Sequence, residues 1–170
     1  MDGALYMRGW DPDHGEEIWK IDGGNQYMIK DIETEPFLGS YPSLFSAVTL
    51  EGLGERLFFS ANNFYSGVHP WISAGLPGNT ERLKVINEIS GDSETGSFTG
   101  FQGEAWFKAD DGINGSELWI SDGTESGTTQ FMDLNPGPAN STPQNFTVVG
   151  DQMFFLATFE SYGFQLWVTD

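Results

Sequence analysis

Short loops rich in aspartate and asparagine are the segments whose residue types could bind a ligand. One loop reads Asp110-Asp111-Gly112-Ile113-Asn114-Gly115-Ser116-Glu117, and another reads Asp11-Pro12-Asp13-His14-Gly15-Glu16-Glu17. Calcium takes about six to eight oxygen ligands, which such loops supply together with a glycine that permits a sharp turn. The predicted calcium ligands are Asp110, Asp111, Asn114, Glu117, Asp11 and Asp13.

A second interpretation gives the same polar side chains to the turns themselves. Asp and Asn accept hydrogen bonds from nearby backbone N–H groups, and glycine adopts the positive φ that tight turns need. The spacing is not that of an EF-hand, and the corresponding loops offer only Asn62 with Asn63 and, further on, Glu160. The sequence therefore favours turn formation, with a bound cation as the alternative.

Aromatic residues accompany these loops and suggest a contact surface. They are Trp10, Phe64, Tyr65, Phe159 and Tyr162. Exposed aromatic rings beside carboxylates and amides can bind sugars, through ring stacking combined with hydrogen bonds. The alternative, which we favour, is that these rings pack on neighbouring repeats or on a missing part of the same protein.

Catalytic constellations are sparse. The two histidines are His14, in an acidic turn, and His69, which occupies the position held elsewhere by Glu17, Glu117 and Gln165 and is therefore predicted at a strand edge. No serine nucleophile motif, phosphate loop, dinucleotide fingerprint or HExxH segment is present. Many acidic side chains are expected from the composition alone, so the sequence predicts no enzyme.

The elements that must position these loops form an internal repeat. Tryptophans at 19, 71, 119 and 167 are separated by 52, 48 and 48 residues, and each follows a glycine by four positions. An aromatic-rich strand precedes each tryptophan, and a segment with an acidic residue (Asp31, Glu88 or Asp133) follows the first three. Such self-similarity at a fixed period indicates a repeat architecture.

Each repeat predicts four short strands separated by Asp, Asn, Gly and Pro. In the third repeat the strands are near residues 105–109, 117–121, 129–134 and 146–150. The second strand is apolar on both sides of its tryptophan, which predicts burial between two layers. We expect an all-β fold of β-propeller-like repeats built from four-stranded antiparallel sheets, with an open β-solenoid as the alternative.

The copy number predicts an incomplete propeller. The single repeat domain 1–170 divides into units of approximately 5–56, 57–104, 105–152 and a partial unit 153–170. About three and a half blades cannot close a ring comfortably. We therefore expect the missing part to come from another segment of a longer protein or from another chain.

Charge and composition exclude several classes of function. Lys and Arg number 7 against 25 Asp and Glu, so the formal net charge is −18, and cysteine is absent. Such a chain is repelled by nucleic-acid phosphates and anionic membrane surfaces, and it offers no disulfide or thiolate metal site. No apolar stretch is long enough for membrane insertion, and no cleavable signal is visible at Met1.

Residues 115–146 resemble the ELWxxDGT repeat, a family of tandem repeats found mainly in large secreted or surface proteins of bacteria. The matching residues are Glu117, Leu118, Trp119, Asp122, Gly123, Thr124, Gly127, Thr128, Asp133, Pro136, Gly137, Ser141 and Pro143. The first repeat keeps part of the pattern, including Glu17, Trp19, Asp22 and Ser40, whereas the second keeps little beyond Trp71 and Gly75. The resemblance implies a propeller-like β architecture and an extracellular setting, with no established catalytic activity.

These observations predict a structural or protein-interaction module that is extracellular, at the cell surface or periplasmic. Its partners would be other protein subunits or the remainder of a longer chain. The alternatives are a carbohydrate-binding, lectin-like module and, less favoured, a glycan-acting enzyme. Asn114, Asn140 and Asn145 stand in glycosylation sequons that matter only in a eukaryotic secretory host.

Overall fold

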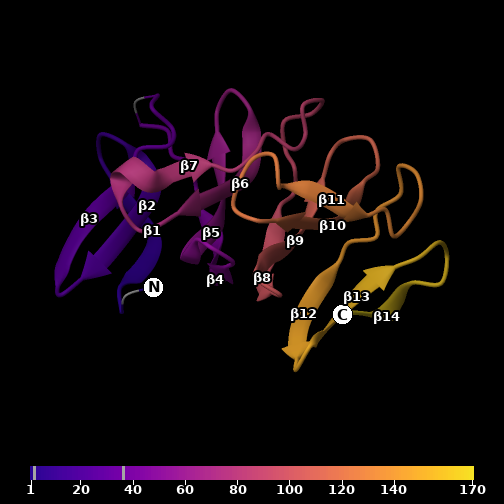
Figure 1. The fold of residues 1–170 in the computed structure, drawn as a ribbon. Helices are drawn as coiled ribbons and strands as arrows, with labels where there is room; N and C mark the ends of the chain where they lie inside the picture. Colours follow the sequence, from indigo (N-terminus) through magenta and orange to yellow (C-terminus); the bar gives the residue numbers. More distant parts are fainter. Residues whose placement is uncertain (2, 36) are drawn as a thin grey trace.

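The computed structural model describes residues 1, 3–35 and 37–170, and it confirms the all-β prediction (Figure 1). The first sheet contains β1 (Leu5–Asp11), β2 (Gly15–Asp22) and β3 (Asn25–Lys30). The second contains β4 (Ser43–Leu50), β5 (Gly54–Asn63), β6 (Gly67–Ser73) and β7 (Thr80–Arg82). The third contains β8 (Gly96–Phe101), β9 (Glu104–Asp110), β10 (Ser116–Ser121) and β11 (Thr129–Met132). The fourth contains β12 (Gln144–Val149), β13 (Gln152–Thr158) and β14 (Phe164–Thr169).

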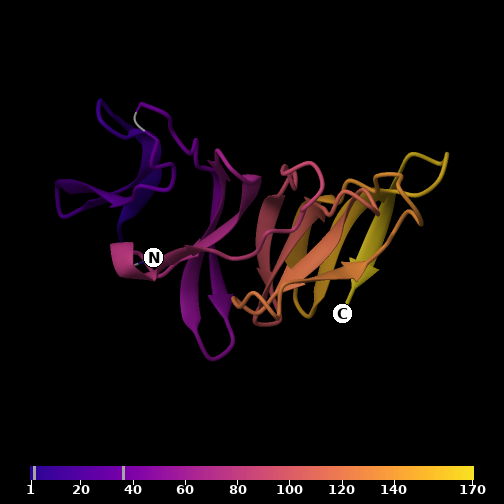
Figure 2. The same cartoon turned by 90° about the horizontal axis from the view of Figure 1, so that it is seen from above.

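The four antiparallel sheets follow one another in chain order, as blades do in an incomplete propeller. Figure 2 shows the first and last sheets at opposite ends of the molecule. The two three-stranded sheets are these end sheets, and both inner sheets have four strands. Within the described residues the only helical element is the single 3-10 turn Pro77–Asn79, so the structure agrees with the propeller-like arrangement predicted from the repeats.

The sheet borders are offset by one strand from the sequence repeats. The strand predicted to end each repeat pairs instead with the first strand of the next repeat, as β8 does with β9. The turn between them explains this pairing, because Gln102 and Gly103 both have positive φ, of 50° and 79°. A two-residue turn with positive φ at both positions matches the twist of a hairpin and joins its strands directly.

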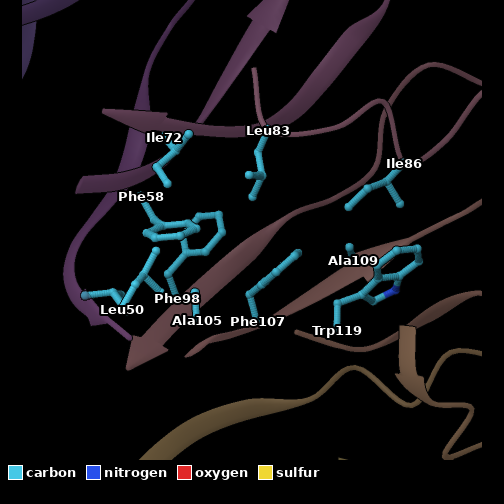
Figure 3. Close-up of a cluster of buried hydrophobic side chains, with 11 residues drawn as sticks. Leu50, Phe58, Ile72, Leu83, Ile86, Phe98, Ala105, Phe107, Ala109 and Trp119 are labelled. Atoms are coloured by element: carbon cyan, nitrogen blue, oxygen red, sulfur yellow. The ribbon is translucent and has the colours of Figure 1, made fainter. Parts of the chain in front are cut away.

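Three hydrophobic clusters form the core, one at each junction between successive sheets. The cluster between the first and second sheets contains Ile18, Ile29, Ile32, Leu57, Phe59, Ala61 and Trp71. The cluster between the second and third contains Val48, Leu50, Phe58, Ile72, Leu83, Ile86, Phe98, Ala105, Phe107, Ala109 and Trp119 (Figure 3). The cluster between the third and fourth contains Phe101, Trp106, Leu118, Leu134, Met153, Phe155 and Ala157. Each inner sheet therefore contributes apolar side chains from both of its faces.

Strand β10 shows how one inner strand supplies two layers. Trp119 belongs to the cluster shared with the second sheet, whereas its neighbour Leu118 belongs to the cluster shared with the fourth. Successive side chains of a strand point to opposite faces, so a strand between two layers presents apolar side chains on both of its faces. The predicted burial of this strand is confirmed.

Candidate functional site

A buried glutamate closes the third sheet onto the segment that leads to the fourth. The Glu117 carboxylate accepts hydrogen bonds from Leu134 N at 2.7 Å, Ser141 N at 2.9 Å and Ser141 Oγ at 2.6 Å. The side chain is fully buried, and burial raises the pKa of Glu117, with these hydrogen bonds acting in the opposite direction. This carboxylate fastens the connection after β11 to the middle of the sheet.

The first sheet repeats this arrangement. Glu17 accepts from Ile32 N at 3.1 Å, Ser40 N at 3.0 Å and Ser40 Oγ at 2.6 Å, and burial likewise raises its pKa. In these two repeats, the glutamate two positions before the tryptophan and the serine about 24 residues later thus form one structural unit. Sequence comparison of the repeats identified both residues but did not reveal that they contact each other.

The second sheet replaces this glutamate with His69, and the predicted strand-edge position is wrong. His69 is fully buried on β6, an inner strand of the order β4-β5-β6-β7. Its position faces the segment that leads from β7 to the third sheet, as the position of Glu117 faces the segment that leads to the fourth. The His69 Nε2 donates to Ser66 O at 2.7 Å, its Nδ1 has no hydrogen-bond partner among the described residues, and burial lowers its pKa. Asp92 supplies a substitute link by accepting from Val68 N at 2.9 Å.

The predicted equivalence of Glu88 with Asp31 and Asp133 is also wrong. Asn87 donates to Asp92 O at 3.0 Å just as Asn135 donates to Asn140 O at 3.2 Å, which makes these two asparagines equivalent. Val85, two residues before Asn87, therefore holds the position of Asp133. Val85 follows Trp71 by 14 residues, just as Asp133 follows Trp119, so this stretch contains no insertion; Glu88 was matched because it is the first acidic residue after that position.

In the loops proposed for calcium, the carboxylates accept hydrogen bonds from their own turns. Asp111 accepts from Ile113 N, Asn114 N and Asn114 Nδ2 at 2.7–2.8 Å, and Asp110 accepts from Gly112 N at 2.6 Å. Glu117 is engaged with Ser141. In the part of the chain that the structure describes, no group of three or more His, Asp or Glu side chains is arranged to hold a metal ion.

The loop of the first sheet is organised by an aspartate–histidine pair. Asp11 Oδ1 lies 2.6 Å from His14 Nδ1 and accepts from Asp13 N at 2.9 Å, whereas the Asp13 side chain is exposed. The hydrogen bond between the two side chains raises the pKa of His14 and lowers that of Asp11. Asp11 therefore acts as a turn-forming residue here, and calcium binding by these loops stays a prediction.

The loop aromatics are largely exposed and remain in separate groups. Phe159 and Tyr162 stack within one loop at 6.4 Å between ring centroids, and Phe64 contacts Tyr65 edge-on at 5.6 Å within another. The Tyr65 hydroxyl donates to Glu35 Oε1 at 2.7 Å. Trp10, at the end of β1, is 68 % exposed. The structure thus places these rings at the surface without joining them in one site.

The outer face of the first sheet is an apolar surface that the sequence did not single out. We call it the N-terminal face; its residues are Leu5, Met7, Gly9, Trp19 and Ile21. Leu5 is 58 % exposed, whereas the residue at the same repeat position in each later sheet (Leu57, Ala105 or Met153) is buried. The Trp19 ring lies against Gly9, where a Cβ would come within 2.6 Å of it, and borders a pocket of about 250 Å³.

The outer face of the last sheet is its counterpart. We call it the C-terminal face; its residues are Val149, Phe154, Leu156, Leu166 and Val168. Leu166 is 70 % exposed, whereas Leu118 and Ile18 at the same repeat position are 1 % and 0 % exposed. In every internal junction a face of this type packs on a face of the N-terminal type. The two ends therefore present the two halves of the internal junction.

Comparison of the chain with protein-family models, with curated proteins and with solved structures gave no match in any of the three. Among the described residues, no helix has the length and apolar character needed to cross a membrane.

Proposed function

We propose that this protein is a structural and protein-interaction repeat module without catalytic activity, which binds other protein through its two end faces. The observation that carries the proposal is that both end sheets expose apolar side chains at positions where the inner sheets bury them. Residue positions that are buried at three internal junctions are exposed on the N-terminal face of the first sheet and the C-terminal face of the last. Contiguous exposed apolar patches of this kind mark interaction sites.

The geometry of the polar groups supports a module of this type. The buried glutamates fasten loops to sheets, and both histidines make local contacts within turns or strands. The resemblance to secreted and surface repeat proteins supports an extracellular, cell-surface or periplasmic setting. The partners are other subunits or further repeats, because nearest-neighbour stacking is how repeat proteins bury their faces.

An extended chain tests the proposal directly. Asp170 stands where the third repeat has Asp122, so a copy of residues 123–170 appended after Asp170 continues the repeat in register. The added sheet should cover the C-terminal face, and burying Leu166 alone contributes about 1.5–3 kcal/mol. We expect the thermal midpoint to rise by about 5 °C or more, measured by calorimetry.

The control is the same extension carrying Leu166→Asp, which the unextended chain tolerates because this residue is exposed. This variant should lose most of the gain. If the appended repeat melts separately and leaves the original midpoint unchanged, the C-terminal face does not bind a further sheet and the proposal is wrong.

Carbohydrate binding is the second candidate, and the exposure of the loop aromatics favours it. Tyr162 and Trp10 are each more than two-thirds exposed, and Tyr162 stacks on Phe159. A glycan array with the wild type, Trp10→Ala and Tyr162→Ala tests this function. Selective binding that one substitution removes supports it, and uniform signal across all glycans eliminates it.

A further inference from the structure

The outer edge of β14 lacks the strand that completes the two inner sheets. In those sheets β7 pairs with β6, and β11 pairs with β10. Strand β14 instead ends the order β12-β13-β14. An edge strand carries backbone N–H and C=O groups that an extended segment can pair with by β-augmentation.

One side-chain contact recurs where each outer strand begins. The Ser73 hydroxyl lies 2.6 Å from the Thr80 hydroxyl, and the Ser121 hydroxyl lies 2.8 Å from the Thr128 hydroxyl; all four side chains are buried. The residue at this position of β14 is Thr169, which also carries a hydroxyl. The edge of β14 therefore keeps the group that meets the incoming strand in both inner sheets.

A second contact in the third sheet holds the backbone two residues after the end of the outer strand β11. Glu117 accepts a hydrogen bond from Leu134 N at 2.7 Å. The corresponding residue on β14 is Gln165, whose amide nitrogen donates to Tyr162 O at 3.1 Å and whose Oε1 remains an acceptor. Strand β14 thus offers an acceptor as well as a hydroxyl, in the same order as β10.

We propose that the edge of β14 binds an extended protein segment with Ser or Thr at one position and an apolar residue six positions later. Both inner sheets show this pattern, in Thr80 with Ile86 and in Thr128 with Leu134, and both apolar residues are buried in the next junction. Strand β14, with its Leu-Trp-Val sequence, resembles β10 more than β6. The best-matched segment is therefore Ser-Gly-Thr-Thr-Gln-Phe-Met-Asp-Leu-Asn, residues 126–135 of this chain.

The test uses a capped, fluorescent peptide of residues 126–135 added to the full chain, with binding measured by anisotropy. Gln165→Ala and Thr169→Val should each weaken binding about tenfold, because each removes one hydrogen-bonding partner. Thr147→Val, on the opposite edge strand β12, is the matched control and should leave the affinity unchanged.

Two N-methylated peptides add a test that does not depend on the folding of protein variants. Methyl groups on the backbone nitrogens of residues 129 and 131 block one side of the segment, and those on 130 and 132 block the other. We expect one of the two methylation patterns to abolish binding, because it blocks the side of the peptide that pairs with β14, and the other pattern to retain binding. Equal binding of both peptides, unchanged affinity in Gln165→Ala and Thr169→Val, or no binding at 1 mM peptide (about −4 kcal/mol) would overturn the inference.

This inference deepens the proposed function by naming the partner of one end. Its failure is distinguishable from failure of the proposed function. If the appended repeat stabilises the chain but the peptide does not bind, the C-terminal face still binds a sheet while the edge of β14 does not recruit a separate segment.

Discussion

Strands β10 and β14 are nearly the same sequence in two different environments. Each has a Leu-Trp-aliphatic core followed by a hydroxyl residue, and each pairs with the strand before it in the same register. Leu118 is buried at the junction with the fourth sheet, whereas Leu166 is exposed to solvent. The comparison shows that burial in this architecture is decided by the neighbouring sheet and not by the strand itself, as expected where stability comes from nearest-neighbour contacts.

The largest expected effect comes from truncating the same leucine in both strands. Leu118→Ala should lower the free energy of unfolding by about 2–5 kcal/mol, because it removes a buried side chain and leaves a cavity. Leu166→Ala should change it by no more than about 0.5 kcal/mol, because solvent already reaches that side chain. Urea denaturation of the two variants measures both values.

A Leu166→Ala effect as large as that of Leu118→Ala would contradict the exposure of the C-terminal face. Repeating the measurement at several protein concentrations sharpens the result. A loss that disappears on dilution would mean that a second copy of the chain covers the face in solution, because association stabilises by mass action.

The next largest effect compares the third sheet with the second at Ser141 and Ser93, the equivalent serines in the segments that lead to the next sheet. Ser141 donates to the Glu117 carboxylate at 2.6 Å, whereas Ser93 donates to the neutral carbonyl of Val68 at 2.7 Å. Hydrogen bonds to charged groups contribute about 1.5–3 kcal/mol and neutral ones about 0.5–1.5 kcal/mol. Ser141→Ala should therefore destabilise more than Ser93→Ala in chemical denaturation, and equal losses would mean that Glu117 is not charged when buried.

The buried glutamate also predicts how stability changes with pH. The folded pKa of Glu117 is raised by burial above its ordinary value of 4.5. The stability that this group contributes is therefore fully present below pH 4.5 and is lost as pH rises through the folded pKa. Unfolding free energies of the wild type and Glu117→Gln, measured from pH 4 to 7, should show the wild type losing stability relative to the variant as pH rises.

Glu125→Gln is the control for this pH series, because Glu125 is an exposed acid and the substitution changes the net charge equally. Its difference from the wild type should vary less with pH. Parallel curves for the wild type and Glu117→Gln would show that the hydrogen bonds from Leu134 and Ser141 offset the effect of burial completely.

The repeat could be predicted from the sequence because each copy must form the same kind of packed junction with the neighbouring sheet. Tryptophans, glycines and flanking apolar residues recur at one period, which predicts the strands and their burial between layers. The sheet borders were not readable, because a strand before a tight turn looks the same whether it ends one sheet or begins the next. The positive φ of Gln102 allows the tight turn that joins β8 to β9, and glutamine is not a residue type that predicts positive φ.

The candidate site was less predictable for a related reason. Polar loop residues attract attention in a sequence, and here the structure shows Asp11 and Asp111 bonded to their own turns. The end faces consist of ordinary core residues such as Leu166, whose sequence pattern is the same whether or not a neighbour covers them. Only the arrangement of the sheets in space distinguishes an uncovered face from a buried one.

The smallest expected effect concerns the loop of the third sheet, where calcium and turn formation make different predictions for one residue. Asp111→Ala removes an acceptor for Ile113 N, Asn114 N and Asn114 Nδ2, so it should destabilise by about 1 kcal/mol in either case. Because these groups are near the surface, water replaces part of what is lost. If the carboxylate only forms the turn, the melting temperature of the wild type is the same in calcium and in chelator. If it binds calcium, the ion raises the melting temperature of the wild type and not of Asp111→Ala, and calorimetry in both buffers decides which chemistry this loop performs.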